Sequence, residues 1–168
     1  MCIRDRAYYR YASASGINAS IEDMSKWLRL MLGHYPSVLT EEQITQLIQP
    51  KTQTTKELRR RHWQGHLNKA HYGLGWRVYD FEGQQLVHHG GWVSGYRADI
   101  TFAPEYGVGL VFLMNAESNL INKFRVDFWD DVFKNLDKTD LYNGNVANSF
   151  APPQRVSITD ELQTIHQD

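Results

Sequence analysis

The sequence predicts an α+β domain in which an antiparallel meander of about four strands is flanked by helices. Three observations support this class. Apolar residues recur at helical spacing in 18–33 and 39–50. From Tyr72 onward, apolar and polar residues alternate instead, with turn residues between the runs, which is typical of hairpins. Helical spacing returns in 119–136, so we expect a covering helix after the sheet.

Both N-terminal helices carry their own start signals. In the first, Ser20 is the expected N-cap and Asp23 follows three residues later. In the second, Thr40 and Gln43 form the same pair, and Pro50 prevents continuation. The expected buried faces are Ile21, Met24, Leu28 and Met31 in the first helix, and Ile44, Leu47 and Ile48 in the second.

The expected strands are 72–83, 84–89, 96–103 and 108–115. Alternation in the third strand divides its residues between two faces: Arg97, Asp99 and Thr101 on one, Tyr96, Ala98, Ile100 and Phe102 on the other. The fourth strand is almost entirely apolar, so we expect cover on both faces. The segment 51–70 is expected to be irregular. The last helix is expected to pack on the sheet through Ile121, Phe124, Phe128 and Val132.

Composition excludes several classes of protein. The formal net charge of −1 provides no field for nucleic acid or an anionic membrane, and the basic run 56–62 is interpreted as a solvated surface. Cys2 is the only cysteine, so no intrachain disulfide can form. The longest apolar run, 108–114, is too short to span a bilayer.

The stretch His88–Gly95 is the strongest candidate for chemistry. Paired glycines let a ligand approach the backbone, free N–H groups stabilise an oxyanion, and a histidine exchanges a proton near neutral pH. A glycine-rich connection between two strands, with half-exposed histidines, accounts for the same residues. Both interpretations remain open on composition alone.

Three other groups are set aside. Ser94 lies in Gly-Trp-Val-Ser-Gly, where glycine follows the serine directly, so it does not fit the Gly-x-Ser-x-Gly nucleophile elbow. His62 and His66 have the spacing of a helical metal pair, with His71 nearby, but no glutamate lies between them and a glycine does. The adjacent carboxylates of Asp130 and Asp131 are interpreted as a solvated helix face. No metal and no cofactor is expected.

Three segments together resemble the serine β-lactamase and penicillin-binding-protein family, specifically its class C and esterase-like branch. They are "SGINASIEDMSKWLRLML", "YGLGWRVYDFEGQQLVHHGG" and "GYRADITFAPEYGVGLVFLMNAE". The resemblance covers about residues 11–136 and implies a partial β-lactamase-like (transpeptidase-like) fold. It divides the chain into a junction or artefactual start at 1–6, the C-terminal part of a serine hydrolase domain at 7–136 and a polar tail at 137–168.

The resemblance places His89-Gly90-Gly91 where the family has Lys-Thr-Gly, and it places the backbone N–H of Trp92 in the family's oxyanion hole. His89 is thereby implied as catalytic, with Gly90 and Gly91 binding substrate. A lysine is a permanent cation, whereas histidine is charged only below roughly pH 6.5. Gly90 also lacks the hydroxyl that would bind a carboxylate. An ester or peptide-like acyl substrate is therefore favoured over strong recognition of a β-lactam carboxylate.

The nucleophile that the resemblance implies is missing. No serine of this sequence has lysine three positions later, and the family's Tyr-x-Asn or Ser-x-Asn element is also absent. One hypothesis is therefore that this chain is a C-terminal fragment of an acyl hydrolase. The fragment is expected to be inactive alone and prone to self-association, and its full-length parent is expected to act on small-molecule acyl substrates. The family also suggests a periplasmic or exported parent. The other hypothesis is a non-catalytic binding domain on the same fold.

Overall fold

The computed structural model describes residues 17–63 and 65–135. Within them, six strands form one antiparallel sheet in the order β1-β2-β3-β4-β5-β6, so each strand pairs with its neighbours in the sequence. The α+β class and the meander are confirmed, with six strands in place of about four. The strands are β1 (Thr52–Gln53), β2 (Leu67–Tyr72), β3 (Arg77–Phe81), β4 (Gln84–Val93), β5 (Tyr96–Ala103) and β6 (Val108–Met114).

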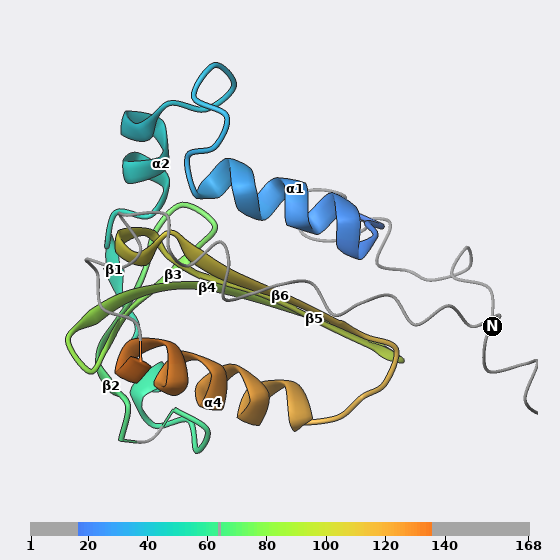
Figure 1. Ribbon diagram of the computed structural model, residues 1–168. Helices are drawn as coiled ribbons and strands as arrows, with labels where there is room; N and C mark the ends of the chain where they lie inside the picture. The colour runs from blue at the N-terminus through green and yellow to red at the C-terminus, as the bar shows by residue number, and fades with distance from the viewer. Residues whose placement is uncertain (1–16, 64, 136–168) are drawn as a thin grey trace, which may run out of the picture. The chain divides into compact units, whose positions relative to one another are not determined.

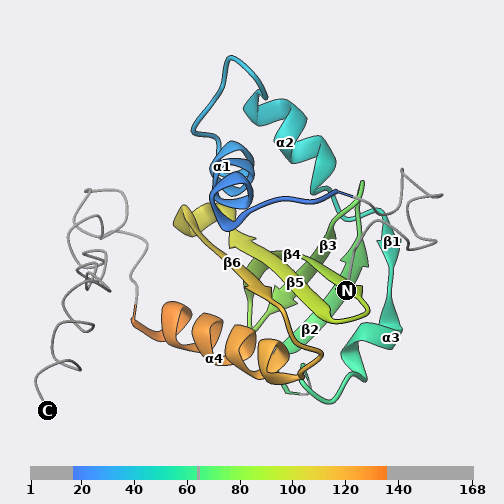
Figure 2. The ribbon, with the colours of Figure 1, turned by 90° about the vertical axis from the view of Figure 1, so that its right-hand side faces the viewer.

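Helices cover both faces of this sheet (Figures 1 and 2). The helices α1 (Ile21–Met31) and α2 (Glu41–Leu47) lie on one face, and α4 (Leu120–Asn135) lies on the other. The short α3 (Thr55–Leu58) packs against β2. A short 3-10 turn, Pro104–Tyr106, joins β5 to β6. No helix among the described residues is long and apolar enough to cross a membrane.

The start signals of the first two helices are confirmed. Ser20 and Thr40 each accept a hydrogen bond from the backbone N–H three residues later, and Asp23 and Gln43 bond back to the cap backbone. Such a pair satisfies two backbone donors that the helix start leaves free. The core on this face of the sheet consists of Leu28, Met31, Ile44, Ile48, Trp76, Val78, Val87, Ile100 and Phe102. Ile21 was expected in it, but its side chain is 52% exposed.

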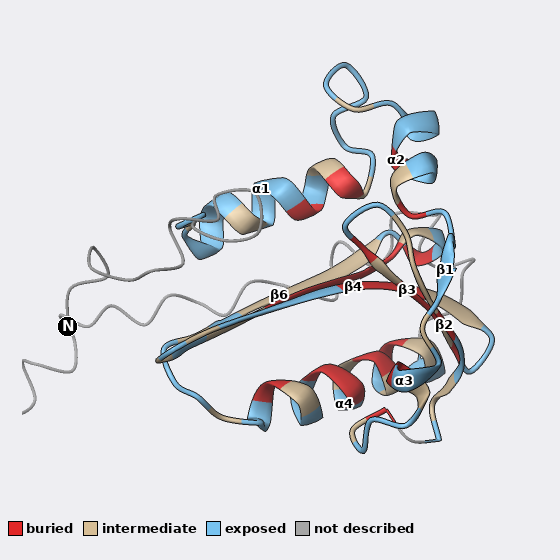
Figure 3. Cartoon of the chain, turned by 180° about the vertical axis from the view of Figure 1, so that it is seen from behind, coloured by how far each residue is buried: buried red, intermediate tan, exposed pale blue. Residues whose placement is uncertain are grey.

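The opposite face is filled by aromatic side chains. Trp63 packs edge-on against Tyr79 and Phe81, and the indole N–H of Trp129 donates to Thr101 Oγ1 at 2.8 Å. Figure 3 shows buried residues along the side of α4 that faces the sheet. These are Ile121, Arg125, Val126, Trp129 and Val132. Phe124 of the expected stripe stacks on Phe112 of β6 although it is 42% exposed, and the stripe omitted a buried arginine.

Two other expectations need correction. The segment 51–70 contains β1, α3 and most of β2, rather than irregular chain. The strand expected at 72–83 begins only at Arg77, because Gly73 to Trp76 form the turn from β2, and Leu74 is exposed there. The apolar β6 is covered by α1 on one face and touches α4 on the other through Phe112 and Phe124, yet it lies at the sheet edge and is only partly buried.

Candidate active site

The histidine–glycine stretch lies within a strand, not in a loop after one. Strand β4 continues to Val93 and pairs with β5 from Val87 to Val93. Its other neighbour, β3, pairs with it only as far as His88, opposite Arg77. Among the described residues, the edge of β4 from His89 onward therefore has no strand beside it. Backbone groups at such an edge are available to a ligand.

The two histidines point to opposite faces of the sheet, because side chains alternate along a strand. His89 pairs with Ile100, which belongs to the core under α1, and its exposed ring lies edge-on to Trp76 at 6.4 Å. Partial burial, followed by the nearby Arg77 guanidinium, lowers the pKa of His89 below 6.5. At neutral pH this imidazole is therefore a neutral proton acceptor.

His88 belongs to a buried ionic network on the α4 face. Its Nε2 lies 3.0 Å from Asp99 Oδ2 on β5 and 3.0 Å from Nη1 of Arg125 on α4. Arg125 also forms an ion pair with Asp99 and lies over the ring of Trp63 at 4.4 Å. Burial dominates the titration of His88 and lowers its pKa to about 4, although Asp99 opposes the shift. The ring is thus neutral at pH 7.

A second buried ion pair lies nearby around Glu57 of α3. Its carboxylate is 3.0 Å from Arg60 Nε and 3.5 Å from Arg77 Nη1, and it accepts a hydrogen bond from the Tyr79 hydroxyl at 3.1 Å. Burial, and then the Glu57 charge, raises the pKa of Tyr79 above its ordinary value. Glu57 is therefore fully engaged by these three groups.

A polar cavity of about 270 Å³ adjoins both networks and the open edge of β4. Its lining includes Gly90, Gly91 and Trp92 from β4, together with His88, Asp99 and Arg125. A Cβ atom at Gly90 would lie 3.4 Å from His88 Nε2 and 3.7 Å from Asp99 Oδ2. The glycine thus leaves open the space beside the ionic network. Trp92 stands at the rim with 66% of its side chain exposed.

Three of the four residues predicted for the site line the cavity, and the fourth does not. Gly90, Gly91 and Trp92 line it, whereas His89 faces the other side of the sheet. Sequence reasoning missed His88, Asp99 and Arg125 as cavity residues. A detectable signal was the alternation that puts Asp99 and Thr101 on one face of β5. That face is covered by α4, so its polar residues are buried and must be paired.

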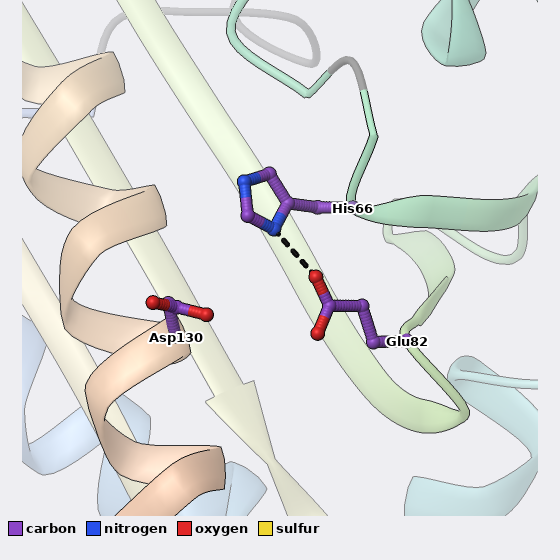
Figure 4. A group of neighbouring side chains, drawn as sticks. All are labelled: His66, Glu82 and Asp130. Carbon is purple, nitrogen blue, oxygen red and sulfur yellow. Dashed lines mark hydrogen bonds and ion pairs between the residues drawn. The ribbon is translucent and has the colours of Figure 1, made fainter.

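The groups set aside earlier lie elsewhere. Ser94 is exposed in the turn between β4 and β5. His66 does not pair with His62. Its Nδ1 lies 2.8 Å from Glu82 Oε1. One ring nitrogen of His66, one carboxylate oxygen of Glu82 and one of Asp130 on α4 lie within 4.8 Å of one another (Figure 4). Asp130 already pairs with Lys134 at 2.7 Å. In this structure the group is thus a cluster of ion pairs at the surface.

The structure is thus an α+β domain, an antiparallel sheet between helical layers with a His-x-Gly strand edge beside a polar cavity. Comparison with protein families shows to which family this domain belongs. The model of the Beta-lactamase family matches residues 3–128, and the chain belongs to this family.

Among solved structures, the chain is similar to an octameric penicillin-binding protein homologue from Pyrococcus abyssi. The two share 24% sequence identity with a TM-score of 0.50. The match covers 59% of this chain but only 21% of that protein, so the likeness supports the fold alone. No curated protein matches the chain.

Proposed function

We propose that residues 7–136 form the C-terminal part of a serine acyl hydrolase, and that the open edge of β4 forms one wall of its active site. The observation that carries this proposal is that the edge of β4, which has no neighbouring strand within residues 17–63 and 65–135, adjoins a polar cavity at Gly90, Gly91 and Trp92. Membership of the Beta-lactamase family supports a hydrolase chemistry for the whole protein.

Each residue of this wall has a distinct task. The backbone N–H of Trp92 donates to the oxyanion that develops on the acyl carbon, an interaction worth about 10²–10³ in rate for a comparable donor. Gly90 and Gly91 admit the acyl group close to the backbone. His89, neutral at pH 7, lies on the other face of the sheet from the cavity, so in this proposal it accepts a proton or orients the leaving group of an acyl group that crosses the open edge of β4. The substrate is an ester, a D-Ala-D-Ala peptide or a β-lactam.

The attacking hydroxyl comes from outside these 168 residues. Every serine lacks a lysine three positions later that would activate it. The chain alone is therefore a fragment without turnover. The proposed junction or artefactual start at 1–6 and the proposed polar tail at 137–168 lie outside the described residues.

The test is hydrolysis of p-nitrophenyl esters and of nitrocefin by a protein extended upstream to include a Ser-x-x-Lys motif. His89→Ala should lower kcat by about 10²–10⁴, as expected for loss of an acid–base group. The matched control is Ser94→Ala in the exposed turn, which should leave turnover unchanged. If the His89→Ala variant and the unaltered protein have the same turnover, His89 does not act in the site.

One observation favours a second candidate, a non-catalytic binding domain on the same fold. The sequence contains no nucleophile paired with a base. The coding sequence upstream of Ala7 separates the two candidates. An in-frame Ser-x-x-Lys there supports the hydrolase, and a promoter with a start codon at Met1 supports the binding domain.

A further inference from the structure

A cluster of three side chains able to ligate a metal lies on the α4 face of the sheet. His66 immediately precedes β2, Glu82 lies in the turn between β3 and β4, and Asp130 lies on α4. One ligand atom of each lies within 4.8 Å of the other two, and Figure 4 shows the three side chains pointing toward one another. None of the three lines the 270 Å³ cavity, so this cluster is separate from the candidate active site.

Two of the three donors are held in place by their surroundings. The ring of His66 stacks on the buried Phe81, with the ring centroids 5.1 Å apart and the planes 18° apart. The backbone N–H of Glu82 donates to the carbonyl oxygen of His66 at 2.9 Å, which ties the turn to the start of β2. Because His66 Nδ1 also lies 2.8 Å from Glu82 Oε1, the imidazole and the carboxylate are arranged before a ligand arrives.

The third donor already attracts a cation. Lys134 Nζ lies 2.7 Å from Asp130 Oδ2. The hydrogen bond with Asp130 raises the pKa of Lys134, and the negative charges of Asp130, Glu82 and Asp131 add to this rise, although desolvation opposes it. Positive charge is therefore favoured beside these carboxylates. The Lys134 side chain is 66% exposed, and because an exposed ion pair contributes little to stability, a more strongly bound cation can displace the ammonium.

We propose that His66, Glu82 and Asp130 form a binding site for Zn²⁺. Imidazole nitrogen and carboxylate oxygen are both zinc ligands, and a water molecule can complete the tetrahedron. Zinc–ligand distances of about 2.0–2.2 Å place the ligand atoms of a tetrahedron about 3.4 Å apart. The donor atoms here lie within 4.8 Å of one another on side chains that are only partly buried, so small rotations bring them to that spacing.

The ligand set distinguishes zinc from the hard divalent cations. Ca²⁺ and Mg²⁺ take shells made of oxygen atoms, and both need more ligands than this cluster offers. An imidazole nitrogen instead suits zinc and its transition-metal neighbours. Three protein ligands and one water are sufficient for Zn²⁺. We therefore expect Zn²⁺ to bind where Mg²⁺ and Ca²⁺ do not.

The bound ion fastens α4 to the sheet. His66 and Glu82 belong to the β2–β4 part of the sheet, whereas Asp130 comes from the covering helix. Because only the folded chain brings these three donors together, zinc binds the folded state and raises the free energy of unfolding. The site is structural, and it does not depend on the proposed function.

The binding test titrates ZnCl₂ into this chain, without a histidine tag, by isothermal titration calorimetry, with MgCl₂ and CaCl₂ in parallel. We expect saturable binding of Zn²⁺ alone. The midpoint of urea unfolding should rise with zinc and return when EDTA removes the ion. Absence of saturable zinc binding, equal affinity for Mg²⁺, or a midpoint that zinc does not raise would overturn the proposal.

Matched variants locate the ion. His66→Gln and Asp130→Asn should each weaken zinc binding at least tenfold, because each removes one of the three ligands. The controls are His71→Gln, on the same strand, and Asp131→Asn, whose exposed carboxylate bonds Asn135 instead. Both controls should bind zinc like the unaltered chain. Unchanged affinity in either ligand variant, or equal weakening in the controls, would show that zinc binds elsewhere and refute the site.

Two further variants distinguish a metal site from a cluster of ion pairs alone. Lys134→Met removes the competing ammonium, so zinc should bind more tightly to this variant than to the unaltered chain. Equal or lower affinity would contradict the displacement of Lys134 by the ion. Glu82→Gln, in the turn, should weaken zinc binding as the other ligand variants do, and it decides the question if either of those fails to fold.

Discussion

The buried histidine of the ionic network should make the stability of this protein depend on pH. His88 is buried and its pKa is lowered from 6.5 to about 4, with burial as the largest cause. The unfolded chain therefore binds a proton at this histidine at a higher pH than the folded protein does. Between these two values the unfolded state holds more protons, so stability rises with pH there and is lost as pH falls from about 6.5 towards 4.

The size of this loss follows from the difference between the two pKa values. At 1.36 kcal/mol per pKa unit, His88 alone accounts for a decrease of about 3 kcal/mol in the free energy of unfolding across this window. That is a large part of the stability of a typical domain. His62 adds a loss of the same sign, because its pKa is also lowered to about 4.

The assay is urea unfolding followed by tryptophan fluorescence at a series of pH values from 7.5 to 4. His88→Gln retains an N–H donor for Asp99 but does not titrate. Between pH 6.5 and 4, the free energy of unfolding of this variant should therefore decrease by about 3 kcal/mol less than that of the unaltered protein. His34→Gln, at an exposed histidine after α1, should retain the full loss. If His88→Gln declines as steeply as the unaltered protein, the burial argument is refuted.

Three further predictions concern packing and association. A Cβ at Gly109 would lie 2.5 Å from Leu28 Cδ1, so Gly109→Ala should lower the free energy of unfolding by about 1–3 kcal/mol, and unchanged urea unfolding would show that α1 moves aside freely. Thr101→Val should cost about 1–3 kcal/mol because it leaves the buried Trp129 N–H unpaired, whereas Thr101→Ser should cost less. The chain should also self-associate, because β6 is an apolar edge strand with exposed apolar side chains near it, and a monomer throughout a sedimentation concentration series would contradict this.

Sequence signals that act over a few residues correctly predicted two helix starts and the two faces of one strand. The capping pairs at Ser20 and Thr40 act over three residues, and the structure contains both. The alternation in 96–103 placed Asp99 and Thr101 on one face, because the two-residue period of a strand depends only on the strand itself.

What the sequence could not predict depends on contacts between distant segments. Alternation does not tell which face of β5 a helix will cover, so the burial of Asp99 became visible only with α4 in place. The buried arginine of α4 was missed because helical spacing was read from apolar residues alone. Arg125 can be buried because its guanidinium forms an ion pair with Asp99 and lies over the ring of Trp63. Strand β1, of two residues, is too short to have a pattern.

The same limit applies to the candidate site. The glycines and Trp92 could be found from a contiguous motif, and they line the cavity. Adjacent histidines, however, must point to opposite faces of a strand, so His88 and His89 cannot serve one pocket as a pair. Arg97, which also lines the cavity, is five residues from Trp92 in the sequence and reaches it only through the β4–β5 hairpin.

In the proposed function, the edge of β4 at Trp92 stabilises the oxyanion of an acyl substrate. The most direct measurement is a crystal structure of the protein extended upstream, with its serine trapped as a phosphonate ester. We expect a phosphonyl oxygen about 2.7–3.1 Å from the backbone nitrogen of Trp92. A trapped adduct whose oxygens all lie away from β4 would contradict it.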